Sequence, residues 1–187
     1  MTDLVALVEA SRRFRATHGV NVFDNYAYRE YLVVDALDAA GFGPVRKLPG
    51  RSGFDAASAA LGNVEIKTTN APKLTPGVLN RGFQFDKQND PDRRATTGNM
   101  DALALATFID DRLRAIALVH EPEGMAAFRA LLRERQDAFE KKMETCRAAN
   151  KRLPRDSIAI SMRDLFDRGV AMTILKMSNK ALEIKRV

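Results

Sequence analysis

The sequence predicts a single α/β domain of the α+β type, in which a mixed central β-sheet is flanked by helices. Apolar residues recur at helical spacing near the N-terminus and in the second half of the chain, and shorter strand-like runs lie between these segments. Glycine and proline separate the runs, and 187 residues fit one domain without repeats or linkers. This order of helices, strands and helices is typical of a layered architecture.

Two helices are expected before the first strand. Their apolar residues repeat three and four positions apart, and glycines follow them at Gly19, Gly41 and Gly43. Short runs of strand type come next, split by further glycines. The elements expected in this half are helices at residues 3–17 and 25–40 and strands at residues 45–48, 54–58 and 63–69.

The second half begins with a long polar stretch, residues 70–99, which we expect to be a loop with a short strand at residues 82–85. Two apolar runs then predict a hairpin, although the first also fits a short helix. A capping box at Ser161 predicts the start of a last helix that ends at Gly169. The other expected elements are strands at residues 101–109, 113–120 and 157–160, a helix at 122–147 and a basic loop at 150–155.

Composition excludes several classes of protein. The net charge of +6 and pI of 9.7 are compatible with a polyanionic partner, but also with a simple solubility role. A single cysteine, Cys146, excludes an internal disulfide framework and a zinc site built on cysteines. No apolar run approaches the roughly 18 residues of a membrane helix. Asp3 and Glu9 replace the basic start of a secretory signal, so we expect a cytoplasmic protein with no membrane partner.

The pattern that points to chemistry comprises Asp55, Glu65 and Lys67. Asp55 is expected at the start of one strand, and Glu65 and Lys67 lie two positions apart on the next. Side chains two apart share a face of a strand, so Ile66 between them is expected in the core. A short turn between the strands would bring Asp55 beside Glu65, which gives the oxygen cluster that Mg²⁺ prefers. A lysine alongside can hold or activate a water, as in metal-assisted phosphodiester hydrolysis.

A structural interpretation of the same residues remains open at this point. A solvated strand face with one cross-strand salt bridge would carry Asp55, Glu65 and Lys67 equally well. The chain itself shows how weak the triplet is alone, because Glu183-Ile184-Lys185 repeats it with no comparable aspartate strand ahead of it. We interpret this second triplet as a chance occurrence.

The context of the first triplet resembles the catalytic block of the PD-(D/E)XK nuclease superfamily, in particular its type II restriction endonucleases. The resemblance rests on an amphipathic helix ending in glycine, followed by Leu48-Pro49-Gly50-Arg51-x-Gly53-x-Asp55-Ala56 and then Glu65-x-Lys67. Phe54 stands where the motif often has proline. Taken more loosely, the resemblance covers residues 27–169, through the long predicted helix and the loop after it.

This resemblance implies a restriction-endonuclease-like core at residues 25–169 for catalysis and DNA recognition, with a helix in residues 1–20 at a dimer interface. It implies a homodimer that uses Mg²⁺ to cut both strands of double-stranded DNA at a short palindrome. A cognate DNA methyltransferase would act separately on the same site. Asp55 and Glu65 would be the metal ligands, the carbonyl of Ile66 a further ligand, and Lys67 the residue that orients the attacking water.

Two other classes remain as alternatives. A junction resolvase or a repair nuclease of the same superfamily would use the same three residues on branched or damaged DNA. A DNA-binding protein without catalysis would keep only the core. Glu30 lies on the helix where some superfamily members carry a further acid near the metal, but we interpret it as an ordinary exposed helix residue.

Base recognition in these relatives uses a histidine-bearing strand after the catalytic block, and this chain has no histidine there. Glutamine and asparagine suit adenine edges and lysine suits guanine, so the polar stretch after the block is the candidate reader. Asn150 matches an asparagine of the relatives' second recognition loop, and its basic neighbours suit phosphates or bases. The candidate DNA-binding residues are Gln84, Asp86, Lys87, Gln88, Asn89, Arg93, Arg94, Asn150, Lys151 and Arg152.

Overall fold

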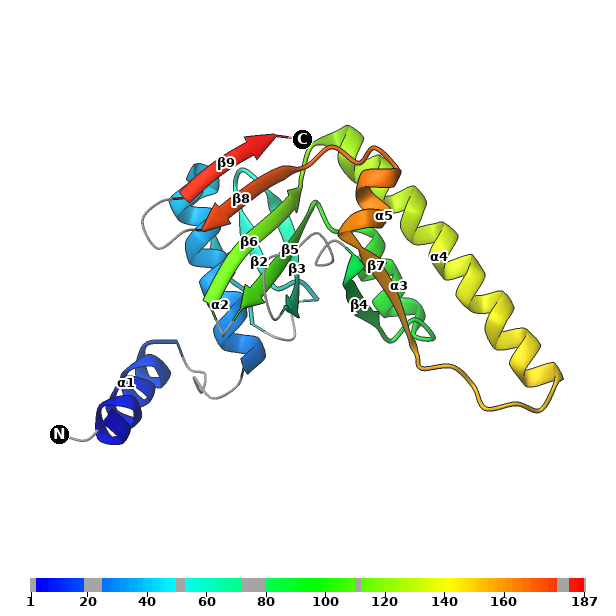
Figure 1. Ribbon diagram of the computed structural model, residues 1–187, viewed down its shortest axis with the longest axis horizontal. Helices are drawn as coiled ribbons and strands as arrows, with labels where there is room; N and C mark the ends of the chain where they lie inside the picture. The colour runs from blue at the N-terminus through cyan, green and yellow to red at the C-terminus, as the bar shows by residue number, and fades with distance from the viewer. Residues whose placement is uncertain are drawn as a thin grey trace.

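A seven-stranded mixed β-sheet forms the centre of the computed structural model (Figure 1). The structure describes residues 3–18, 25–49, 53–71, 80–109, 112–177 and 182–186. In order across the sheet, the strands are β1 (Arg46–Lys47), β2 (Ala56–Ser58), β3 (Gly62–Asn70), β5 (Ala102–Ile109), β6 (Arg112–Val119), β8 (Thr173–Met177) and β9 (Leu182–Arg186). Among these described strands, β3 and β5 alone pair in parallel and the other pairs are antiparallel, so the predicted mixed sheet is confirmed.

A second, two-stranded sheet lies beside the first. It pairs β4 (Gly82–Asp86) with β7 (Ser157–Ser161) in antiparallel register, with Phe85 opposite Ile158. The strand predicted inside the polar stretch is therefore present. Phe83 and Phe85 are buried while Gln84 and Asp86 are exposed, which is the alternation expected of a strand with one face on the core.

The helices occupy both sides of the central sheet and both ends of the molecule (Figure 1). They are α1 (Asp3–His18), α2 (Asn25–Leu37) with its π-helical continuation η1 (Asp38–Phe42), α3 (Pro91–Gly98), α4 (Pro122–Ala148) and α5 (Met162–Asp167). Helix α3 lies in the stretch that we expected to be loop, and β8 and β9 lie in a tail for which no element was predicted. Residues 110 and 111 of the expected hairpin turn lie outside the described residues.

Two apolar layers pack on the opposite faces of the sheet, and strand β5 separates them. Its even-numbered residues from Ala102 to Phe108 join Val33 and Leu37 of α2 in one cluster. Leu103 and Leu105 join the other cluster, which contains α4 and the β4–β7 sheet. Every residue of β5 is buried, as expected for a central strand covered on both faces.

Local sequence signals explain where the later helices begin and end. Helix α4 starts at Pro122, as predicted, and buries the apolar residues that recur along it at helical spacing. Its C-terminal end projects away from the sheet (Figure 1). The predicted capping box of α5 is present, because the Asp164 amide donates to Ser161 Oγ at 3.1 Å and the Ser161 amide donates to Asp164 Oδ2 at 2.8 Å. None of the helices in the described segments is long and apolar enough to cross a bilayer.

Helix α1 packs against its own chain. The ring of Phe14 meets Tyr28 and Tyr31 of α2 edge-on, with centroids 6.3 and 5.4 Å apart. No partner for this helix was predicted within one subunit, and α2 supplies one. A role of α1 in a dimer interface stays a prediction.

Candidate active site

Asp55 lies just before β2, at the point where β2 and β3 separate. Its backbone amide donates to the carbonyl of Val64 at 3.1 Å, and the amide of Ile66 donates to its Oδ2 at 2.7 Å. These two bonds place the carboxylate of Asp55 against β3, one residue from Glu65. The predicted neighbourhood of Asp55 and Glu65 is therefore present, with the Ile66 amide as the link.

Glu65 and Lys67 form an ion pair on the other side of β3 from Ile66. Lys67 Nζ is 2.5 Å from Glu65 Oε1, and the exposed fractions of the two side chains are 17% and 1%. Ile66 is 4% exposed and packs with the α2 cluster, so the predicted alternation holds. The nearly complete burial of Glu65 contradicts a solvated strand face. A carboxylate is rarely taken out of water without a specific partner, and Lys67 is the partner here.

The ammonium of Lys67 also lies over the ring of Phe85, with Nζ 5.6 Å from the centroid. Phe85 is 1% exposed and belongs to β4 of the small sheet. The Glu65–Lys67 pair thus sits between the central sheet and the β4–β7 sheet. Sequence alone predicted Phe85 to lie in a strand, but nothing in it pointed to contact with Lys67.

The donor atoms around Asp55 suit a hard divalent cation. The N–H and C=O of one strand residue point to the same neighbour, so the Ile66 carbonyl is directed to the side of β3 on which Asp55 lies. No group of three or more His, Cys, Asp or Glu side chains in the described segments is arranged to hold a metal. Carboxylate and carbonyl oxygens completed by waters are ligands that Mg²⁺ accepts.

Glu30 of α2 belongs to the same neighbourhood, and its expected exposure is wrong. Its side chain is 22% exposed and forms an ion pair with Lys47 of β1 at 2.8 Å. Burial raises the pKa of the Glu30 carboxyl above its usual value, and the negative charge of Asp55 raises it further, against the lowering effect of Lys47 and Lys67. The strand β1 has only two residues, so the approach of Lys47 to Glu30 was not predictable from periodicity.

Ionised Glu30 is expected to destabilise the fold as the pH rises. The folded-state pKa lies above the reference value of 4.5, so the folded chain holds this proton more tightly than the unfolded chain does. The free energy of unfolding of the wild type, relative to Glu30→Gln, should therefore decrease as the pH rises above about 4.5. Denaturant unfolding of both proteins measures it, with Glu183→Gln as the exposed control. A relative stability that rises with pH would contradict the raised pKa.

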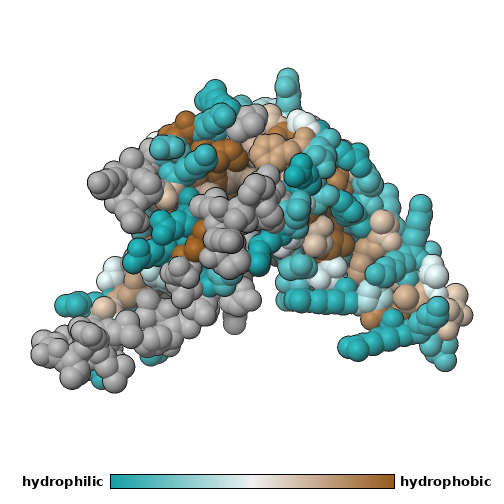
Figure 2. All heavy atoms as spheres, viewed as in Figure 1, coloured by the Kyte–Doolittle hydropathy of each residue, from teal (hydrophilic) through white to brown (hydrophobic). Residues whose placement is uncertain are grey.

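The turn after β4, which holds several of the predicted DNA-binding residues, is joined to the end of the loop that precedes β7. The amide of Lys87 donates to the carbonyl of Asp156 at 2.9 Å, and the amide of Asn89 donates to Asp156 Oδ1 at 2.8 Å. Asn150, Lys151 and Arg152 are exposed in the loop that follows α4 and leads into β7. Hydrophilic side chains project from this end of the molecule (Figure 2).

Two of the candidate DNA-binding residues are used inside the protein instead. Gln88 is fully buried, its Oε1 accepts from Gln136 Nε2 at 3.1 Å, and its Nε2 donates to the carbonyl of Asp86 at 3.3 Å. Arg94 is ion-paired with Glu140 and donates to the carbonyl of Gln88. This arrangement departs from the expectation that Gln88 and Arg94 contact DNA, and it gives both a role in holding the turn after β4.

The remaining candidates differ in how open they are. Gln84, Asp86, Lys87 and Asn89 are exposed, and the Arg93 side chain lies outside the described residues. Gln84 Oε1 accepts from Ser157 Oγ at 3.2 Å. Arg155, from the second loop, lies 3.3 Å from Asp86 as an exposed ion pair. An exposed pair of this kind contributes little stability, so Asp86 and Arg155 can each leave it to contact another molecule.

No family model matches the sequence, and no curated protein matches it. The structure itself shows a mixed α/β fold with a buried carboxylate–lysine pair. An aspartate lies beside this pair, where strands β2 and β3 diverge.

Proposed function

We propose that this protein is a Mg²⁺-dependent type II restriction endonuclease with a restriction-endonuclease-like core, acting as a homodimer on double-stranded DNA. The observation that carries the proposal is the join between Asp55 and β3. The Asp55 carboxylate accepts from the amide of Ile66, and the two neighbours of Ile66 are the buried Glu65 and its partner Lys67. A chain that merely binds DNA gains nothing from a buried glutamate and an aspartate on adjoining strand residues.

Each residue of the site has a distinct part in phosphodiester hydrolysis. Asp55, Glu65 and the Ile66 carbonyl would hold Mg²⁺, which supplies Lewis-acid polarisation of the phosphate and a more acidic water. Asp55 is already oriented by the Ile66 amide at 2.7 Å. Lys67, beside Glu65, donates to the attacking water, orients it, and offsets negative charge on the phosphate.

The proposed recognition surface is the outer face of the β4–β7 sheet with the loop before β7. Gln84, Lys87 and Asn89 supply amide and ammonium groups for base edges. Asn150, Lys151 and Arg152 supply the second segment. The inward residue between Gln84 and Asp86 is Phe85, so the same strand joins this surface to Lys67.

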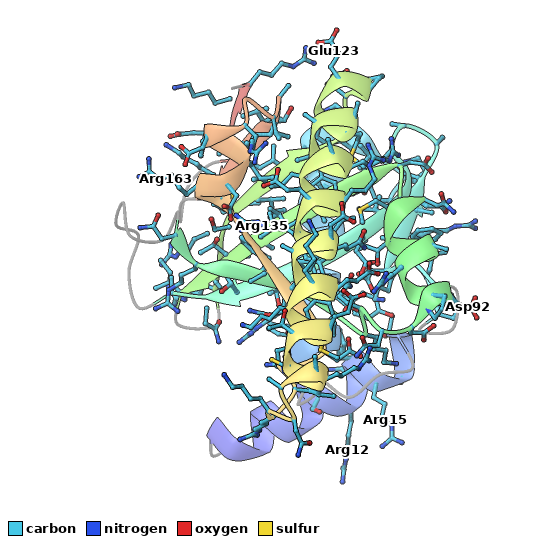
Figure 3. All side chains as sticks on the ribbon, turned by 90° about the vertical axis from the view of Figure 1, so that its right-hand side faces the viewer. Arg12, Arg15, Asp92, Glu123, Arg135 and Arg163 are labelled. Atoms are coloured by element: carbon cyan, nitrogen blue, oxygen red, sulfur yellow. The ribbon has the colours of Figure 1, made fainter. Side chains whose placement is uncertain are left out.

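Positive charge on α1 fits the same function. Arg12 and Arg15 are exposed and point away from the rest of the molecule (Figure 3). In a homodimer the formal charge of +6 doubles, and phosphate contacts release counterions. DNA binding should therefore weaken steeply with added salt. A cognate DNA methyltransferase would protect the host sequence from such an enzyme.

Parallel digestion of a sequenced plasmid and a synthetic four-way junction tests the proposal. Discrete plasmid fragments, formed only with Mg²⁺, are the expected result. Cutting of the junction alone would replace the proposal with a junction resolvase, and cutting of neither substrate by folded protein would contradict a nuclease. Cleavage that stops when the plasmid is methylated would support a partner methyltransferase.

A further inference from the structure

The ammonium of Lys67 contacts both the carboxylate of Glu65 and the ring of Phe85. Lys67 Nζ lies 2.5 Å from Glu65 Oε1 and 5.6 Å from the Phe85 centroid. The negative face of an aromatic ring attracts a cation, most strongly where water is excluded, and Phe85 is 1% exposed. If the ring were removed, the Lys67 ammonium would keep its contact with Glu65 and lose its contact with Phe85.

Phe85 is itself held in place by helix α4. Its ring packs against Phe128 of α4, with centroids 6.0 Å apart and planes at 37°. Phe128 is fully buried in the same apolar cluster. The position of the Phe85 ring is therefore set by the seating of β4 on α4.

Strand β4 joins this ring directly to the outer face of the small sheet. Gln84 and Asp86, the neighbours of Phe85, are exposed on that face. The β4–β7 pair belongs to a sheet separate from the seven strands that carry Lys67. A shift of β4 relative to the central sheet would therefore move the ring relative to the ammonium, and contacts made at Gln84 and Asp86 act on the same short segment of backbone.

We propose that Phe85 is a positioning residue for Lys67, which couples contacts on the outer face of β4 to the placement of the lysine ammonium. This inference rests on the proposed nuclease function for its catalytic consequence. The geometric part, the restraint of Lys67 by the ring, stands without that function.

Phe85→Leu and Phe83→Leu form a matched pair of variants. Both phenylalanines are 1% exposed, both face the same cluster, and they lie two positions apart on β4. The loss of apolar volume should be similar in the two variants. Denaturant unfolding of both should therefore give comparable free energies of unfolding. Among the described residues, the cation–ring contact with Lys67 belongs to Phe85.

Single-turnover cleavage measures the catalytic consequence. Phe85→Leu should slow the cleavage step about tenfold, an effect between those of an exposed and a fully desolvated cation–ring contact, with unchanged affinity for DNA. Phe83→Leu should stay within about twofold of wild type, since it loses no such contact. One altered base pair in the recognition site should reduce the cleavage rate of the wild type by a larger factor than that of Phe85→Leu, because the variant has already lost the coupling between β4 and Lys67. Equal slowing in both variants, or no slowing in Phe85→Leu, would overturn the coupling.

A second readout separates failure of this inference from failure of the nuclease proposal. In protein labelled with ¹³C at the lysine ε carbon, the Phe85 ring current should shift the Lys67 signal upfield. Lys67→Met assigns that signal. The shift should disappear in Phe85→Leu and persist in Phe83→Leu, whether or not the protein cuts DNA. A Lys67 signal that is unchanged in Phe85→Leu would overturn the positioning role.

Discussion

Asp55→Asn is expected to abolish DNA cleavage while leaving the fold intact. The asparagine side chain keeps an oxygen that accepts from the Ile66 amide, so the 2.7 Å bond that seats residue 55 can persist. What disappears is the negative charge that would hold Mg²⁺. Loss of several kcal/mol of metal-derived stabilisation corresponds to a rate at least about 10³-fold lower.

The measurement is single-turnover cleavage of plasmid DNA at saturating protein, with Mg²⁺ and again with a chelator. Binding is measured separately with Ca²⁺ in place of Mg²⁺, and Asp55→Asn should bind DNA within a few-fold of the wild type. Unfolding of the variant by denaturant shows whether its fold is intact. A folded Asp55→Asn protein that cuts at a rate close to wild type would remove Asp55 from the site.

Lys67→Met is expected to affect both cleavage and stability. Removal of one partner of a buried ion pair leaves a buried charge without compensation, and Glu65 is 1% exposed. Such a change costs about 3 kcal/mol of the free energy of unfolding. Cleavage should fall as well, because methionine neither donates to water nor carries charge.

A double variant separates the two effects. Glu65→Gln combined with Lys67→Met removes the buried charge together with its partner, so most of the lost stability should return. Lys185→Met, on the exposed strand β9, is the matched control and should stay within about 0.5 kcal/mol of wild type. If the double variant is no more stable than Lys67→Met, the stability lost in Lys67→Met does not come from leaving the Glu65 carboxylate without its partner.

Local periodicity predicted the parts of the site that lie within one strand. Alternation along β3 placed Ile66 in the core and Glu65 with Lys67 on the opposite face, and the structure has this arrangement. The same is true of the apolar stripe of α4 and of the capping box at Ser161. These features depend on residues a few positions apart, so their spacing in the sequence determines them.

Features that depend on distant segments were not predictable in this way. Gln88 is buried because Gln136 of α4, 48 positions away in the sequence, donates to its side chain. Helix α3 has few apolar residues, and its end is held by Arg129, which donates to the carbonyls of Gly98 and Met100 at 3.1 and 2.7 Å. Glu30 is drawn inward by Lys47 from another element. No pattern within these segments contains their partners.

The two Glu-x-Lys triplets show the difference between a pattern and a site. Glu65 and Lys67 lie on β3, where the amide of Ile66 between them donates to Asp55 and the Lys67 ammonium lies over the Phe85 ring. Glu183 and Lys185 lie exposed on β9, at the edge of the sheet. Their sequences differ only beyond the triplet, and their places in the sheet give them different surroundings.

The most direct test of the nuclease site is therefore Mg²⁺-dependent plasmid cleavage by Glu65→Gln and Glu183→Gln, side by side with the wild type. Both variants make the same chemical change in the same triplet. The proposed site predicts that Glu65→Gln loses at least about 10³-fold in rate and Glu183→Gln cuts like the wild type. Cleavage by folded Glu65→Gln at the wild-type rate, or equal loss in both variants, would contradict it.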